Sequence, residues 1–121
     1  MSRKDRRLAD YLGHVLEAIE RIEQYTAGKG FDDFARNVMA QDAVVRNLEI
    51  IGEACRNIER GDPGFLLRHP GFPLRAAIEM RNVLAHGYFS VDLEIVWRTV
   101  RTSLPGLKAQ VLQATPAERG Q

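Results

Sequence analysis

Residues 80–88, MRNVLAHGY, carry polar side chains at positions where a packed helix has no need of them. Arg81 lies seven residues after Leu74 and seven before Tyr88, so an unbroken helix places it in line with the apolar stripe. A charge in that position must be paired or must face a cleft. His86 comes next to the expected end of the helix, where exposed carbonyl groups favour the protonated imidazole and a nearby arginine opposes it.

The spacing of Arg81 and His86 does not make a tight pair within one ideal helix. Five residues rotate by about 500°, which points the two side chains about 140° apart with a rise of about 7.5 Å. They converge if the helix end is distorted, if Arg81 reaches across, or if a second copy of the chain brings the same segment across a two-fold axis. Taken alone, the residues favour a structural interpretation in which Arg81 bridges helices and His86 caps a helix end.

Composition limits the kind of protein that can hold this segment. The chain has 121 residues, 45% hydrophobic and 27% charged, which is enough for one folded domain. Its net charge of +1 provides no global field toward nucleic acid or a membrane, so any phosphate chemistry must be local. We expect no metal site, because Cys55 is the single cysteine and His14 and His69 lack companions at ligand spacing. No apolar leader or membrane span is found, which predicts a cytoplasmic protein.

Two long helices are expected in the first half of the chain. The first, from about residue 3 to the TAGKG stretch at 26–30, starts with a capping-box pattern at Ser2 and Asp5. It has apolar residues at helical spacing: Leu8, Tyr11, Leu12, Val15, Ile19 and Ile22. A short turn is expected at 31–36, and a second helix at 39–60 has two adjacent apolar strips. That helix is either central in a bundle or also part of a subunit interface.

The second half predicts two further helices. GDPG at 61–64 ends the second helix, and residues 65–73 form a loop or one turn. Pro73 suits the first position of a helix that runs to Gly87. Ser90 or Asp92 can cap a last helix, in which Pro105 introduces a kink or restart with Ser103 as a local cap. The predicted fold is an all-α antiparallel bundle of four main helices with one or two short extra helices, in a domain spanning 1–113 with a frayed tail at 114–121.

The run RNVLAHGY resembles the R-x4-H-x-Y signature of HepT-like toxins, a branch of the HEPN ribonuclease superfamily. The resemblance extends through QDAVVRNLEIIGEACRNI at 41–58 and HGYFSVDLEIVWRTV at 86–100, and it covers nearly the whole chain. The R-x4-H element alone is a weak pattern. Together with the two flanking segments it is highly specific.

The resemblance implies a metal-independent endoribonuclease that cleaves tRNA or mRNA and acts as the toxin of a toxin–antitoxin pair. Arg81 and His86 match its catalytic positions, and Asn82 matches the supporting polar residue after the arginine. The implied partner is an MntA-type nucleotidyltransferase, which uses ATP and Mg²⁺ to attach AMP to Tyr88. Metal-free RNA cleavage needs a base near neutrality and a cation for the phosphorane, which histidine and arginine provide.

Two interpretations of function follow. The first is an RNase toxin that works as a homodimer. The alternative is a non-catalytic helical binding subunit of a nucleotidyltransferase complex. Among the other polar residues, Asn47 and Glu53 can line a cleft or satisfy neighbouring helices, and Gly52 allows close helix packing. The basic cluster of Arg3, Lys4, Arg6 and Arg7 can help to hold RNA, although a solvated helix face explains it more simply.

Overall fold

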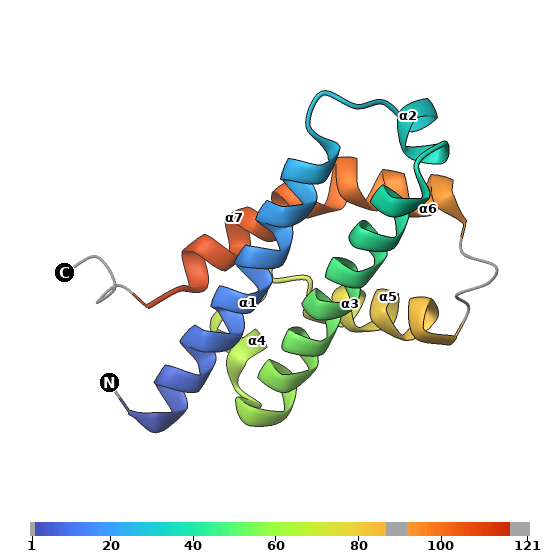
Figure 1. Cartoon of the computed structure of the whole chain (residues 1–121). Helices are drawn as coiled ribbons and strands as arrows, with labels where there is room; N and C mark the ends of the chain where they lie inside the picture. The colour runs from blue at the N-terminus through green and yellow to red at the C-terminus, as the bar shows by residue number, and fades with distance from the viewer. Residues whose placement is uncertain (1, 87–91, 117–121) are drawn as a thin grey trace.

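The computed structural model describes residues 2–86 and 92–116, and every regular element in these ranges is helical. Figure 1 shows the order of these elements along the chain. They are α1 (Arg3–Thr26), α2 (Phe31–Ala35), α3 (Val38–Gly61), α4 (Phe65–Arg68), α5 (Leu74–His86), α6 (Leu93–Arg98), a π-helical turn at Thr99–Ser103 and α7 (Leu104–Ala114). The all-α prediction is confirmed. Within those ranges, no helix is long and apolar enough to cross a membrane.

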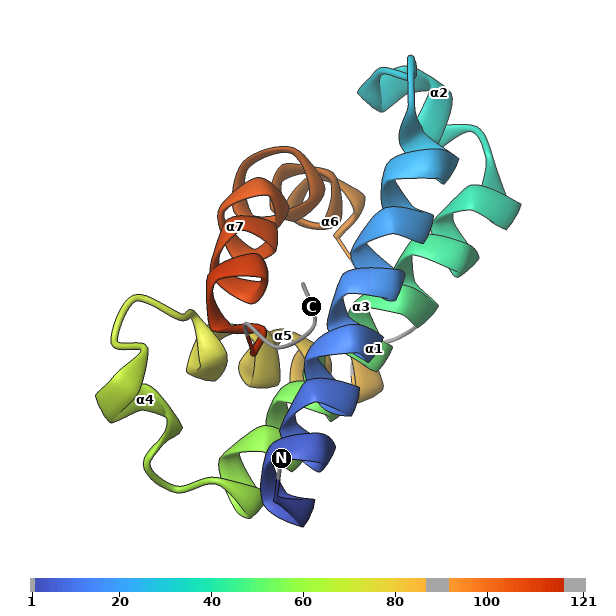
Figure 2. The same cartoon turned by 90° about the vertical axis from the view of Figure 1, so that its left-hand side faces the viewer.

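The helices α1 and α3 form the central antiparallel pair and lie side by side in both views (Figures 1 and 2). The side chain of Ser2 caps α1 by accepting a hydrogen bond from the Asp5 backbone N–H at 3.1 Å, as the capping pattern predicts. The helix ends before Gly28, whose φ of +70° lies in the left-handed region that favours glycine. The pair therefore begins and ends where the local sequence signals predict.

Two further layers cover this pair. α5 crosses α3, and α6 continues through the π-helical turn into α7, which packs against α1 at an angle (Figures 1 and 2). Asp92 caps α6 by accepting hydrogen bonds from the backbone N–H groups of Glu94 and Ile95, as predicted. The alternative cap, Ser90, lies outside the described residues.

Two local predictions differ from the structure. Pro73 precedes α5 and does not occupy its first position: its carbonyl accepts the hydrogen bond from Ala77, which is the role of a cap residue. Ser103 makes no side-chain capping bond, because the chain stays helical through the π turn and leaves no helix start to cap. At the other end, α7 ends at Ala114, whose side chain packs into the core; the domain limit at 113 stays a prediction.

The core lies between these layers and consists mainly of apolar side chains. It includes the predicted stripe of α1 and the first strip of α3, with Cys55 fully buried, whereas only Ala54 of the second strip is buried and Ile50 packs at the edge. Burial raises the pKa of the Cys55 thiol to about 12, so the side chain stays a neutral thiol at physiological pH. The prediction that Cys55 lies in the core is confirmed, and its lack of reactivity stays a prediction.

Candidate active site

The site is built on the crossing of α3 and α5, where Gly52 meets the backbone of α5. A Cβ atom on Gly52 would lie 2.1 Å from the Cβ of Arg81 and 2.9 Å from the carbonyl oxygen of Ala77. Carbon atoms in contact normally stay about 3.5–4.0 Å apart, so only glycine permits this approach. The close packing expected of Gly52 therefore serves a particular residue, because it brings the base of the Arg81 side chain directly onto α3.

Two side chains then hold the guanidinium of Arg81. Its Nη2 lies 3.2 Å from Oε1 of Glu53, the residue that follows Gly52 on α3. Its Nη1 donates a hydrogen bond to Oδ1 of Asn82 at 3.3 Å. The Arg81 side chain is 28% exposed and Glu53 is 50% exposed, so the pair stands at the surface. The prediction that this arginine must be paired or face a cleft is confirmed in both respects.

The cleft is a polar pocket of about 460 Å³ between α1, α3 and α5. Its lining includes a second ion pair, in which Nη1 of Arg46 lies 4.0 Å from Oε1 of Glu49. His14 of α1 lines the same pocket, and so do the backbone or side chains of Ile50, Ala54, Asn57 and Ala85. The guanidinium of Arg81, held by Glu53, thus stands at the edge of an open pocket.

The structure describes the side chain of Arg81 but not those of His86 and Tyr88. His86 is the last described residue of α5, and the predicted end of this helix at Gly87 lies outside the described residues. The side chain of His86 and the whole of Tyr88 lie outside the described part of the chain. Their assignment as catalytic base and AMP acceptor stays a prediction, as does the role of a second copy of the chain in bringing Arg81 and His86 together.

The structure also separates the polar residues of α3 that the sequence left open. Asn47 is 5% exposed; its side-chain amide donates to the carbonyl of Ala43 at 2.8 Å and its Oδ1 accepts from Arg21 at 3.5 Å. Asn47 therefore forms hydrogen bonds within α3 and with Arg21 of α1. Glu53 points into the cleft and positions Arg81, and its place directly after Gly52 is the signal that could have found it. His14 has no such signal, because it reaches the pocket from α1 only after α1 and α3 have paired.

Comparison with known proteins gives a consistent result. Residues 15–114 match the family described as "Ribonuclease HepT-like". The chain belongs to the HepT-like ribonuclease family. It is 45% identical over 101 residues to "Probable ribonuclease HepT" of Thermococcus cleftensis, covering 84% of this chain and 89% of that protein. No solved structure matches.

A longer relative is also similar to this HepT-like chain. "Gamma-glutamylcyclotransferase and putative RNase MJ0434" of Methanocaldococcus jannaschii is 42% identical over 111 residues, which cover 92% of this chain. The chain spans about half the length of that relative, 48%. The region that matches the HepT-like family contains the whole α3–α5 crossing, with Gly52, Glu53 and Arg81. The N-terminal half of α1, with Arg7 and Tyr11, precedes it.

Proposed function

We propose that this chain is a metal-independent endoribonuclease, the toxin of a toxin–antitoxin pair, with Arg81 and His86 as its catalytic residues. The observation that carries the proposal is the arginine of the HepT-like motif, fixed by Gly52 and Glu53 at the edge of a polar pocket. A permanently charged guanidinium in that place can hold phosphate oxygens and offset the extra negative charge of a phosphorane.

The reaction uses the RNA's own 2′-hydroxyl as nucleophile. His86 accepts the proton of that hydroxyl while its oxygen forms a bond to phosphorus. The bond from phosphorus to the 5′ oxygen then breaks, and the imidazolium of His86 returns the proton to the departing oxygen. The products are a 2′,3′-cyclic phosphate and a 5′-hydroxyl end. Asn82, which accepts a hydrogen bond from Arg81, keeps the guanidinium oriented toward the phosphate.

The first experiment is an RNA-cleavage assay with purified, unmodified protein in the presence of a chelator. We expect cleavage that persists with chelator and leaves a 2′,3′-cyclic phosphate or its hydrolysis product. Arg81→Ala and His86→Ala should each abolish cleavage and keep the helical circular-dichroism spectrum. Activity that disappears with chelator, or that survives in either variant, would refute the mechanism. A fully folded protein without any cleavage would favour a non-catalytic binding subunit instead.

A homodimer with a composite site follows from the 140° divergence of Arg81 and His86 in one helix. The test mixes the two inactive variants after joint unfolding and refolding. If each site takes Arg81 from one protomer and His86 from the other, half of the dimers are mixed and each holds one intact site. About a quarter of the wild-type activity should then return. No recovery, or a fully active monomer in sedimentation, would exclude a composite site.

Silencing by an MntA-type nucleotidyltransferase completes the proposal. The partner would transfer AMP from ATP to the hydroxyl of Tyr88 and release pyrophosphate, with Mg²⁺ as its own cofactor. The new phosphate would compete with RNA for Arg81 and repel the RNA backbone. After incubation with partner and ATP, peptide mapping should find the AMP mass on Tyr88, and Tyr88→Phe should resist modification. An AMP group found elsewhere, or none, would remove Tyr88 from this role.

A further inference from the structure

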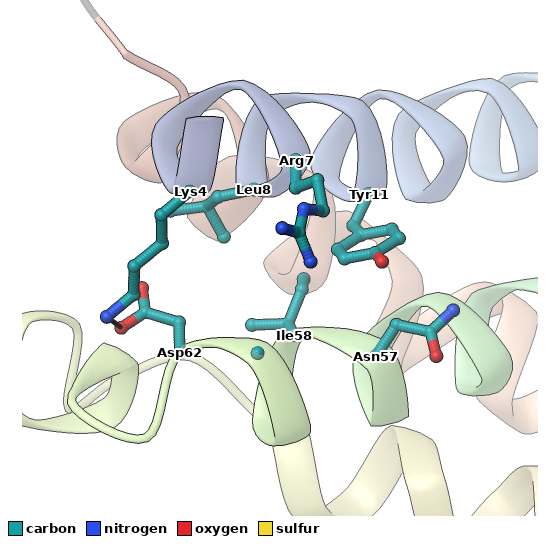
Figure 3. Close-up of a pocket in the computed structure, with 8 residues that line it drawn as sticks. Lys4, Arg7, Leu8, Tyr11, Asn57, Ile58 and Asp62 are labelled. Carbon is teal, nitrogen blue, oxygen red and sulfur yellow. Dashed lines mark ion pairs between the residues drawn. The ribbon is translucent and has the colours of Figure 1, made fainter. Parts of the chain in front are cut away.

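A second pocket lies between α1 and α3, beside the cleft that contains Arg81. It measures about 210 Å³, and Figure 3 shows its lining side chains. Arg7 and Tyr11 extend from α1 toward α3 over an apolar floor that includes Leu8 and Ile58 (Figure 3). Leu8 is 9% exposed and Ile58 is 1% exposed, so this floor is part of the core. The pocket thus combines a cation, an aromatic ring and an apolar base.

The charges around this pocket leave one cation available. Asp62, with a side chain 6% exposed, is paired with Lys4 at 3.6 Å and with Arg68, and the hydrogen bond from Arg68 lowers the pKa of Asp62. Asp62 is therefore ionised and already neutralised by two cations. Among the ion pairs of the described residues, none uses Arg7, which is exposed. An anion that enters the pocket would meet a net positive charge with Arg7 as its donor.

The two pockets are neighbours on one face of the α1–α3 pair. Asn57 lines both of them. Tyr11 of the first pocket and His14 of the second are in edge-on contact, with ring centroids 6.5 Å apart. Among the described residues that line the second pocket, both carboxylates are paired, Glu49 with Arg46 and Glu53 with Arg81. A chain with regularly spaced anions could therefore occupy both pockets at once.

We propose that the pocket of Arg7 and Tyr11 is a subsite for a nucleotide of single-stranded RNA next to the one cleaved at Arg81. Arg7 holds a backbone phosphate, and an unpaired base stacks on the ring of Tyr11. A cationic groove with an aromatic platform is the usual way in which proteins bind single strands without reading their sequence. The subsite rests on the proposed ribonuclease function, and it gives a role to Arg7 of the N-terminal basic cluster.

The test measures binding separately from cleavage. The probe is a fluorescent 12-nucleotide RNA carrying 2′-O-methyl groups, which cannot be cleaved through the 2′ oxygen. Its affinity is measured by fluorescence anisotropy between 50 and 300 mM salt. Variants at the subsite are Arg7→Ala, Tyr11→Leu and Tyr11→Phe. The matched control is Arg3→Ala, which removes the same charge from the same helix at a residue that does not line the pocket.

We expect Arg7→Ala and Tyr11→Leu each to weaken binding about tenfold. Arg7→Ala should also lower the salt slope by about 0.7, the value for one phosphate contact on a single strand. Tyr11→Phe, which keeps the ring, and Arg3→Ala should stay within about twofold of wild type. Equal effects of Arg3→Ala and Arg7→Ala, or wild-type binding by Arg7→Ala and Tyr11→Leu, would refute the subsite, and so would absence of binding by the wild type.

Folding and activity controls keep this test separate from the proposed function. Each variant is first melted by circular dichroism. Because Tyr11 packs partly against the core, a destabilised Tyr11→Leu is replaced by Tyr11→Met, which fills similar space without a ring. A protein that binds the probe through Arg7 and Tyr11 but never cleaves RNA would contradict the ribonuclease and leave the binding site standing. A nuclease unaffected at Arg7 and Tyr11 would contradict only the subsite.

Discussion

Substituting Gly52 by alanine is the sharpest test of how the fold positions Arg81. The change adds one methyl group at the α3–α5 crossing, 2.1 Å from the Cβ of Arg81, 2.8 Å from its Cγ and 2.9 Å from the carbonyl oxygen of Ala77. A Cβ atom and a carbonyl oxygen are fixed to the backbone of α5 and cannot swing aside. The helix must therefore move outward by about 1.5 Å to restore a normal carbon–carbon contact.

The change in the free energy of unfolding of Gly52→Ala is the balance of two opposing effects. Alanine is preferred over glycine inside a helix by about 1 kcal/mol, which favours the variant. Overpacking a tight contact costs about 1–3 kcal/mol, and moving α5 also loosens the rest of its packing on α3. We expect Gly52→Ala to lower the free energy of unfolding by about 1–2 kcal/mol, or about 5 °C in melting temperature. A displacement of Arg81 by more than 1 Å should also reduce kcat by about 100-fold.

The matched control is Gly13→Ala in the middle of α1, where an added Cβ has no atom within 4 Å. This variant should gain about 0.5–1 kcal/mol in stability and keep its activity, because it receives the helix preference without the clash. Urea unfolding and RNA cleavage are measured for both variants. If Gly52→Ala is as stable and as active as Gly13→Ala, the close crossing does not position Arg81 and the reasoning fails.

Three further predictions follow from the contacts around the site and core. Glu53→Ala should change the free energy of unfolding by less than about 1 kcal/mol, because the Glu53–Arg81 pair is partly exposed, but it should lower kcat more than it raises KM. Glu53→Gln keeps an acceptor for Arg81 and should recover most of the rate. Equal rates in the wild type and both variants would exclude a positioning role for Glu53. Cys55, with a pKa of about 12, should not react with Ellman's reagent at pH 8 until urea unfolds the protein; rapid labelling of the native state would contradict its burial. Asp62→Asn should cost about 1 kcal/mol at neutral pH. Because Arg68 lowers the pKa of Asp62 in the folded state, the stability difference between wild type and Asp62→Asn should be complete above the unfolded pKa of about 3.9. It should shrink as the pH falls through the lower pKa that Asp62 has in the folded protein. A stability difference that does not depend on pH would refute the electrostatic cause.

Much of the fold could be predicted because its signals are local. The spacing of apolar residues identifies α1 and α3, and Ser2 and Asp92 mark helix starts through hydrogen bonds within three residues. The prediction for Ser103 was wrong because a serine can cap a helix start only where the preceding helix has ended. In the structure the chain continues past Ser103 through the π-helical turn, whose Val100 is buried.

The sequence by itself determined the types of residue in the motif. It also determined the face of the helix on which Arg81 lies, since helix periodicity fixes that face. The tertiary structure decided which partners that face meets. Gly52 and Glu53 lie almost thirty residues before Arg81 in the chain, and His14, Tyr11 and Arg7 lie on a third helix. Whether such residues share a cleft depends on crossing angles and the close approach of backbones, which arise only when all helices pack together.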